Sequence, residues 1–157
     1  MPNIIEGTLA APAQRFAIVA AKFNREIVNK LVEGALAGFK QHGVKDEAID
    51  LVRVPGTVEV PLVCQKLAAS GKYAAVIALG AVIRGDTDHY EYVCQAATHG
   101  VLQAGLSTGI PMIFGILTCQ TEELALARAG GAEGNKGFDA AVAALEMAYL
   151  LRKLPKS

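Results

Sequence analysis

The sequence predicts an α/β fold in which helices cover both faces of a four-stranded parallel sheet. Strand-like and helix-like segments alternate along the chain, as successive βαβ units would produce. The segment 73–83 is rich in Val, Ile and Ala without polar alternation, which is typical of a strand buried on both faces. This segment is too short to cross a bilayer as a helix. We therefore expect a three-layer αβα sandwich.

The predicted elements follow one another with short connections. The pattern predicts strands over 15–21, 49–54, 73–83 and 112–117, and helices over 24–42, 59–70, 88–107, 121–129 and 136–152. The helix over 24–42 has the clearest pattern, because its apolar residues share one face. Asn24 is expected to cap its start and Gly43 to end it, and Asp88 is expected to cap the helix over 88–107. The segment 130–135 is expected to be a flexible turn.

The helix over 88–107 carries a stripe of small residues at helical spacing. Its members are Ala96, Ala97, Gly100, Ala104 and Gly105. A glycine inside a helix costs about 1 kcal/mol relative to alanine, so close packing should offset Gly100. A contact between subunits and packing on the chain's own sheet both fit this pattern.

Composition limits the classes of function. The 157 residues are expected to form one domain, 1–157, and 52% hydrophobic residues with a mean hydropathy of +0.34 indicate apolar surface for subunit interfaces. Fifteen basic and fifteen acidic residues balance without long runs, so nucleic acid and membranes are poor partners and a small molecule is favoured. The N-terminus lacks the pattern of a signal peptide, which favours the cytoplasm. The distant Cys64, Cys94 and Cys119 are expected to be buried thiols.

Polar and aromatic residues gather directly after the predicted strands. Ligands bind outside the carboxyl ends of parallel strands, so these residues are expected to line a single rim. The rim residues are Phe23, Asn24, Gly56, Thr57, Val58, Glu59, Gly85, Asp86, Thr87, His89, Phe114 and Thr118. They would supply an aromatic face, a carboxylate, hydroxyls, an imidazole that titrates near neutral pH and a glycine-containing turn for an anion.

Each candidate also has a structural alternative. Phe23 fits either core packing or an exposed ring for stacking. Glu59 fits either a favourable charge at a helix N-terminus or a ligand contact. His89 alone would be an ordinary first-turn histidine, but the other polar residues at the predicted rim favour a role in proton transfer. Arg128 at a helix end and Lys136 in a turn would carry no functional signal in isolation.

Several known motifs are absent from the sequence. The spacing Gly80-x4-Gly85-Asp86-Thr87 matches a Walker A loop, but Asp86 stands where that loop needs its lysine. The dinucleotide fingerprint, the nucleophile elbow and the zinc-protease motif do not occur. No metal-ligand spacing is present, so no metal is expected.

Five short motifs occur in a fixed order along the chain. They are Phe23-Asn24, Pro55-Gly56-x-x-Glu59-x-Pro61, Gly85-x-Thr87-x-His89-Tyr90, Arg128-Ala129-Gly130 and Gly134-Asn135-Lys136-Gly137. Their order and spacing resemble those of bacterial lumazine synthases over nearly the whole chain. The resemblance implies the penultimate step of riboflavin biosynthesis, in which 5-amino-6-ribitylaminouracil and 3,4-dihydroxy-2-butanone 4-phosphate condense to 6,7-dimethyl-8-ribityllumazine. It also implies that no cofactor is needed.

The resemblance implies a role for each motif residue. Phe23 would stack on the pyrimidinedione ring, and the backbone of Val82 and Ile83 would hold the ring edge. The ribityl chain and its surroundings would involve Asn24, Gly56, Thr57, Val58 and Glu59, with Phe114 and Lys136 coming from a neighbouring subunit. The phosphate would lie between the backbone of Gly85, Asp86 and Thr87 and the guanidinium of the neighbour's Arg128. His89 would transfer protons, and the side chain of Asp86 would point outward.

The resemblance also implies assembly into pentamers. The short turn over 128–137 favours a sixty-subunit icosahedral shell with the helix over 88–107 facing the fivefold channel. Residues 1–14 would pack on a neighbouring subunit and add an edge strand to its sheet. Riboflavin synthase is a candidate partner inside such a shell.

Two other functions fit the same motifs. A non-catalytic flavin- or lumazine-binding module of flavodoxin-like shape would keep the ring pocket without the chemistry, although the retained His89, Arg128 and Lys136 argue against it. A structural shell would need the assembly but not the catalysis.

Overall fold

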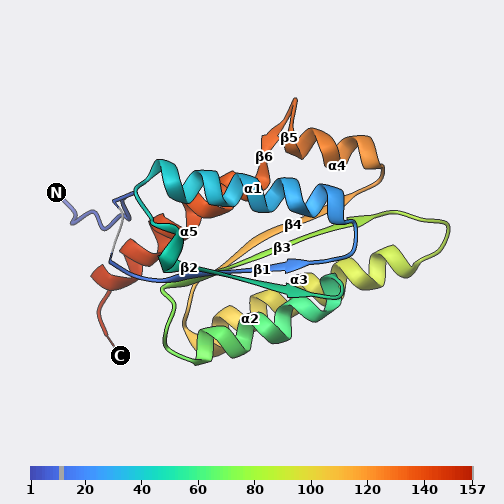
Figure 1. Ribbon diagram of the computed structural model, residues 1–157. Coiled ribbons are helices and arrows are strands. Elements are labelled where there is room, and N and C mark those ends of the chain that lie inside the picture. The colour runs from blue at the N-terminus through green and yellow to red at the C-terminus, as the bar shows by residue number, and fades with distance from the viewer. Residues whose placement is uncertain (11–12, 157) are drawn as a thin grey trace.

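The structure is a computed structural model that describes residues 1–10 and 13–156. Its strands β1 (Phe16–Ala21), β2 (Ile49–Val54), β3 (Ala75–Ile83) and β4 (Met112–Cys119) form one parallel sheet in the order β2-β1-β3-β4. The helices are α1 (Arg25–Gln41), α2 (Val60–Ala69), α3 (His89–Thr108), α4 (Glu122–Arg128) and α5 (Lys136–Lys153). Two 3-10 turns, η1 (Asp46–Ala48) and η2 (Thr57–Glu59), precede β2 and α2. Helices lie on both sides of the sheet (Figure 1), which confirms the predicted α/β fold with a four-stranded parallel sheet.

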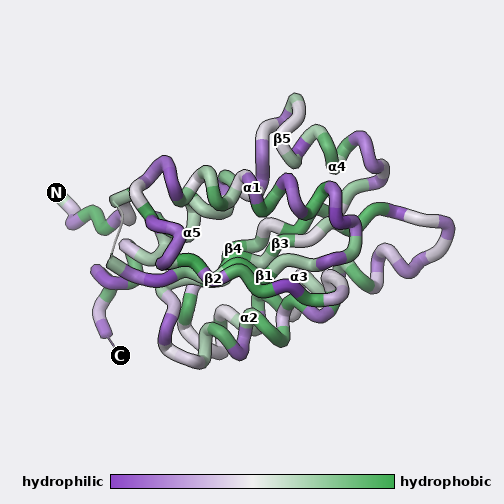
Figure 2. The backbone as a smooth tube through the Cα atoms, viewed as in Figure 1, coloured by the Kyte–Doolittle hydropathy of each residue, from purple (hydrophilic) through white to green (hydrophobic). Residues whose placement is uncertain are grey.

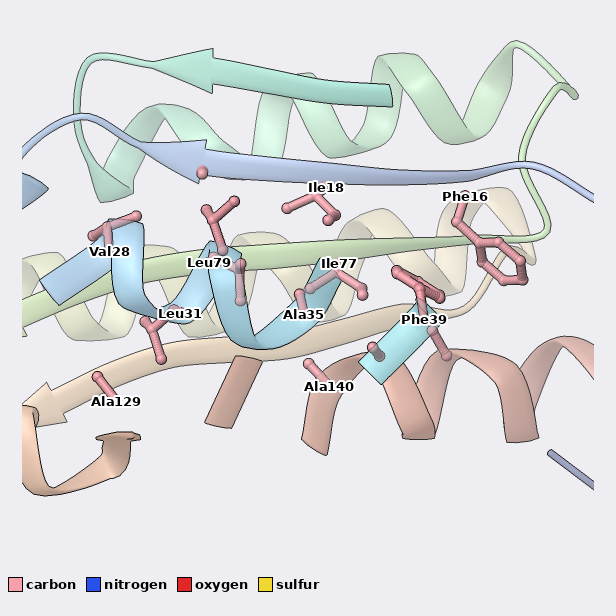
Figure 3. Packing of buried hydrophobic residues seen from close by; sticks show 14 of the residues in the cluster. Phe16, Ile18, Val28, Leu31, Ala35, Phe39, Ile77, Leu79, Ala129 and Ala140 are labelled. Atoms are coloured by element: carbon pink, nitrogen blue, oxygen red, sulfur yellow. The ribbon is translucent and has the colours of Figure 1, made fainter. Parts of the chain in front are cut away.

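Each face of the sheet has its own apolar core. On the face covered by α1 and α5, the Phe16 and Phe39 rings have centroids 4.9 Å apart and belong to the same core as Leu79 (Figure 3). The core on the other face joins the sheet to α2 and α3 and includes Val101. β1 is buried along its whole length and β3 is buried up to its last residue, so both strands need apolar residues at successive positions (Figure 2).

Glycines let α1 and α5 pack closely. A Cβ on Gly137 would lie 1.8 Å from the carbonyl O of Leu31, and one on Gly34 would lie 2.1 Å from Oδ1 of Asn135. Larger residues at either position would therefore force the two helices apart. This packing fixes the start of α5, and with it Lys136.

All three predicted cap residues lie at the ends of their helices, but the side chains of Asn24 and Asp88 make no cap hydrogen bond. Gly43 follows α1 with a φ of 85°, as expected of a glycine that ends a helix. Asn24 makes no cap hydrogen bond and has a left-handed backbone, with φ 55° and ψ 47°. Asp88 makes no cap hydrogen bond either, and Thr87 Oγ1 instead accepts from the backbone N–H of His89 at 3.3 Å. The positions of Asn24 and Asp88 as N-cap residues are therefore confirmed, and only the capping by their side chains is wrong.

The segment 130–135 is more ordered than the turn that its composition predicts. β5 (Ala129–Gly131) pairs antiparallel with β6 (Gly134–Asn135). The backbone N–H of Glu133 donates to the carbonyl O of Ala127 at 2.8 Å. Gly130 and Gly134 have φ values of 109° and 81°, which let the chain reverse within a few residues.

The small residues of α3 pack mainly within the chain. A Cβ on Gly100 would lie 2.6 Å from the Cβ of Pro61, so the glycine allows α2 to pack closely against α3. Ala97 and Ala104 are buried, whereas Ala96 is exposed. The helix that Gly100 accommodates is thus α2 of the same chain.

Residues 1–10 form no strand in the single chain. Ile4 and Ile5 are exposed, while Gly7 lies against α5, where an added Cβ would be 2.1 Å from the carbonyl O of Glu146. Residues 11 and 12 of the predicted N-terminal segment 1–14 lie outside the described residues. The edge strand for a neighbour stays a prediction.

The cysteines are free, as expected, but they differ in burial. Cys64 and Cys119 are buried, and burial raises the pKa of Cys64 to about 12. Cys94 is half-buried, so the prediction of buried thiols is wrong for this residue.

Candidate active site

A pocket of about 680 Å³ opens at the carboxyl ends of β1, β2 and β3, on the side where the loop from β3 to α3 lies (Figure 1). We call it the carboxyl-edge pocket. The predicted site residues that line it are Phe23, Asn24, Gly56, Thr57, Val58, Glu59, Val82, Ile83, Gly85, Thr87 and His89. Pro55, Ala81, Tyr90 and Val93 complete the lining. The structure therefore brings together residues that are spread over more than sixty positions of the sequence.

Phe23 presents its ring to solvent at the mouth of this pocket. The residue is 71% exposed, which excludes the alternative of core packing. Its backbone N–H donates to the carbonyl O of Pro55 at 3.1 Å. The backbone N–H of Lys22 donates to the carbonyl O of Val54 at 2.7 Å. These bonds continue the pairing of β1 with β2 beyond the sheet, so they hold the ring at the pocket.

The turn η2 forms another wall of the pocket. Thr57 is 6% exposed, and Gly80 of β3 makes room for it, because a Cβ there would lie 2.8 Å from Thr57 Oγ1. Glu59 is exposed, and its backbone N–H donates to the carbonyl O of Gly56 at 3.2 Å. A buried threonine and an exposed carboxylate thus share one short turn.

The loop between β3 and α3 brings His89 to the pocket as the first residue of α3. Gly85 and Thr87 line the pocket with it, whereas Asp86 is exposed and does not. Arg84 also stays outside, with Nη1 3.5 Å from Oε1 of Glu91.

Tyr90 and Val93 are lining residues that the strand-end argument missed. Helical spacing could have found Val93, which lies four residues after His89 and on the same helix face. Burial raises the pKa of the Tyr90 phenol, and Cys94 raises it further, so the phenol stays protonated at neutral pH.

A second cavity, of about 330 Å³, lies beside β4. We call it the cation cleft, and its lining residues are Phe114, Gly115, Ile116, Leu117, Thr118, Cys119, Arg128 and Lys136. It shares no lining residue with the carboxyl-edge pocket. The prediction of a single rim is therefore wrong for Phe114 and Thr118, which line the cation cleft instead. Phe114 is the third residue of β4 and does not lie at its carboxyl end.

The two cations of this cleft are placed by α4 and α5. Nη1 of Arg128 donates to the carbonyl O of Leu124 at 3.0 Å. Burial raises the pKa of Cys119, and the positive charge of Arg128 opposes this shift, which places the guanidinium near the thiol. Lys136 is the first residue of α5.

Asn135 fixes the position of Lys136, and sequence reasoning missed it. Its Oδ1 accepts from the backbone N–H groups of Gly137 at 2.8 Å and Phe138 at 3.1 Å, which caps α5. Its Nδ2 donates to the carbonyl O of Lys30 on α1 at 3.0 Å. An asparagine directly before a helical run was the signal that could have revealed this cap.

The fold and this pair of cavities define a small-molecule enzyme of the α/β class. The carboxyl-edge pocket can stack a planar ring, accept hydrogen bonds and move protons, and the cation cleft can attract an anion. Within 1–10 and 13–156, no group of three or more His, Cys, Asp or Glu residues could hold a metal ion. None of the helices described is long and apolar enough to span a membrane.

Comparison with known proteins gives the family. Residues 13–152 match the family model described as 6,7-dimethyl-8-ribityllumazine synthase. The chain is also 52% identical over 154 residues to the 6,7-dimethyl-8-ribityllumazine synthase of Desulfotalea psychrophila (strain LSv54 / DSM 12343), over 98% of this chain and 99% of that protein. The chain therefore belongs to the 6,7-dimethyl-8-ribityllumazine synthase family, and the resemblance seen in its motifs is confirmed. Its function is the enzymatic lumazine synthase reaction of riboflavin biosynthesis.

Proposed function

We propose that the carboxyl-edge pocket of one subunit and the cation cleft of its neighbour form one active site. There, 5-amino-6-ribitylaminouracil and 3,4-dihydroxy-2-butanone 4-phosphate condense to 6,7-dimethyl-8-ribityllumazine, with release of phosphate and water. The observation that carries the proposal is the meeting of Phe23, Glu59 and His89 in one pocket that no Lys or Arg lines. A phosphate-bearing substrate needs a cation, and the cation cleft is lined by Arg128 and Lys136.

The pyrimidinedione is bound by stacking and by its edge. Phe23 is exposed at the mouth of the pocket and offers a ring face. The backbone of Val82 and Ile83, at the end of β3, lines the same pocket and would hydrogen-bond the ring edge. The ribityl chain then runs along the wall formed by Asn24, Gly56, Thr57, Val58 and Glu59. Lys136 and Phe114 of the neighbour close this end of the site.

The butanone phosphate lies at the loop before α3. The backbone of Gly85, Asp86 and Thr87 would donate N–H groups to the phosphate, and Arg128 of the neighbour would supply a bidentate guanidinium. The exposed side chain of Asp86 points to solvent, which keeps its charge away from the anion.

His89 moves the protons that the condensation requires. Schiff-base formation, phosphate elimination and ring closure each need a proton accepted or donated, and an imidazole does both near neutral pH. Bringing both substrates into one pocket supplies several kcal/mol through proximity alone. Proton transfer by His89 therefore adds to a reaction that binding has already accelerated.

Such shared sites require an oligomer, which we expect to be a pentamer as the resemblance implies, and twelve pentamers would form a sixty-subunit icosahedral shell. Exposed apolar residues on α3 and β4 support a large interface there: Tyr92 is 71%, Leu102 58%, Leu106 74% and Phe114 43% exposed. Residues 1–14 would add an edge strand to the neighbour's sheet, and riboflavin synthase would be the enclosed partner in the cytoplasm. Light scattering that finds only pentamers at every pH and phosphate concentration would contradict the shell.

The experiment that tests the proposal is a two-substrate assay. Purified protein is mixed with the ribitylaminouracil and the butanone phosphate, and lumazine fluorescence and phosphate release are followed against the uncatalysed reaction. Coupled formation of both products above background is the expected result. Binding of lumazine or flavin without acceleration would instead support a non-catalytic binding module or an inert shell of the same fold.

A further inference from the structure

Asn24 has an unusual backbone conformation at the edge of the pocket. It is the one non-glycine residue with a positive φ in the described ranges 1–10 and 13–156. Left-handed backbone is unfavourable for residues that carry a Cβ, and Asn and Asp tolerate it best. The chain therefore needs a local contact that maintains this geometry between β1 and α1.

That contact is a hydrogen bond from the side chain of Asn24 to the end of β3. Nδ2 donates to the carbonyl O of Ala81 at 2.7 Å. A carbonyl oxygen only accepts, so the amide nitrogen must face Ala81 and Oδ1 must face away. The bond joins residues 57 positions apart in the sequence.

The partner carbonyl belongs to the peptide that precedes Val82. Because a trans peptide is planar, the Ala81 carbonyl faces Asn24 while the Val82 N–H faces the opposite way, toward β4, with which Val82 pairs. On the other side of Asn24, the N–H of Phe23 donates to the carbonyl O of Pro55. The Phe23-Asn24 pair is thus tied both to the end of β2 and to the end of β3.

We propose that Asn24 is a positioning residue, whose carboxamide fixes the stacking ring of Phe23 relative to the end of β3, where Ile83 lines the pocket. This inference rests on the proposed function, because it requires that Phe23 and the end of β3 bind one planar heterocycle. It differs from the role that the resemblance implies, in which Asn24 contacts the ribityl chain.

Two ligands separate the positioning role from a ribityl contact. One is 6,7-dimethyl-8-ribityllumazine, and the other is 6,7-dimethyllumazine, which has the ring without the ribityl chain. Their dissociation constants are measured by fluorescence titration with the assembled wild-type protein, Asn24→Asp, Asn24→Gly and Glu59→Gln. Asp and Gly both accept the left-handed backbone, but neither can donate to the Ala81 carbonyl. Glu59→Gln is the matched control, because it alters the wall assigned to the ribityl chain.

We expect both Asn24 variants to weaken both ligands by the same factor, about tenfold, since one half-buried hydrogen bond is lost. Glu59→Gln should weaken only the ribityl ligand. Thermal unfolding midpoints close to wild type in either Asn24 variant show that the loss is local. Asn24 variants that weaken only the ribityl ligand would overturn the inference and leave the proposed function standing. A wild-type protein that binds neither ligand would overturn both.

Discussion

The two cavities differ in the chemistry that they contain. The carboxyl-edge pocket has an exposed aromatic ring, a carboxylate and an imidazole, and no Lys or Arg lines it. The cation cleft has Arg128 and Lys136, and no carboxylate or imidazole lines it. A condensation that binds a phosphate and moves protons needs both sets. This difference supports the proposal that the two cavities are complementary halves of one site shared between subunits.

The cavities also differ in how the chain builds them. The carboxyl-edge pocket is formed where β1, β2 and β3 pass into the segments that follow them, so short motifs after each strand contain most of its residues. The cation cleft combines successive residues of β4 with the last residue of α4 and the first residue of α5. Substitutions in the carboxyl-edge pocket should therefore weaken binding of the ring-containing ligand, and substitutions in the cation cleft should weaken use of the butanone phosphate.

The largest effect is expected for Arg128→Ala. Loss of the guanidinium removes the charged partner of the phosphate, so kcat/KM for the butanone phosphate should fall by about a hundredfold. The affinity for ribityllumazine, measured by fluorescence titration, should change much less. Arg128→Lys is the matched control, and it should recover only part of the loss because an ammonium cannot bind the phosphate bidentately. An equal loss for both ligands would show that the cavities do not divide the substrates in this way.

Phe23→Ala should produce the opposite pattern. Loss of the stacking face should weaken ribityllumazine by about tenfold, since stacking on an aromatic side chain contributes about 1–3 kcal/mol. KM for the butanone phosphate should stay near the wild-type value. Phe23→Tyr keeps the ring and should retain affinity. Because the ring is 71% exposed, the unfolding midpoint should hardly change, and a large drop would mean that Phe23 is a core residue.

His89→Ala should slow the reaction without abolishing it. We expect kcat to fall by about tenfold, which is a smaller loss than removal of a general acid–base group usually causes. The loss is small because proximity supplies much of the acceleration. The affinity for ribityllumazine should be preserved. Stopped-flow measurement of lumazine formation tests this, with circular dichroism as the check on folding. Wild-type turnover in the variant would remove His89 from the mechanism.

The smallest effect is expected at the opposite end of the sheet, which serves as a control for both cavities. The Tyr73 hydroxyl and Arg15 Nη2 donate to Oδ2 of Asp50 at 2.5 Å and 2.9 Å, and these bonds lower the pKa of Asp50. A lowered carboxylate pKa stabilises the fold above the ordinary value of about 4, and this contribution is lost as pH falls through the lowered pKa. Tyr73→Phe should therefore slightly lower the free energy of unfolding at pH 7. The decrease should be smaller at pH 3, and turnover should be unchanged. A change in kcat would show that this end of the sheet communicates with the site.

The sequence predicts the framework well because burial and helical periodicity determine it locally. The β2 prediction, 49–54, coincides with the observed strand, and the other strands and helices differ by only a few residues at their ends. The errors arise where a side chain has a distant partner. Asn24 looks like a cap until β3 offers it the Ala81 carbonyl, and Asn135 looks like a turn residue until α1 places Lys30 beside it.

The candidate site shows the same limit. Motifs after β1, β2 and β3 predict the lining of the carboxyl-edge pocket, because parallel strands bring their carboxyl ends together. The same reasoning places Phe114 and Thr118 at that rim, but they line a separate cleft together with Arg128 and Lys136 from the helices that follow β4. This arrangement depends on tertiary packing, which local patterns do not encode.

Subunit mixing tests the shared site most directly. His89→Ala, which damages the carboxyl-edge pocket, and Arg128→Ala, which damages the cation cleft, are dissociated, mixed in equal amounts and reassembled. If each site combines one subunit's pocket with its neighbour's cleft, random assembly should create intact sites at about a quarter of the positions, and activity should rise well above either parent. Activity that stays at the average of the two parents would contradict the account, because each chain would then build its site alone.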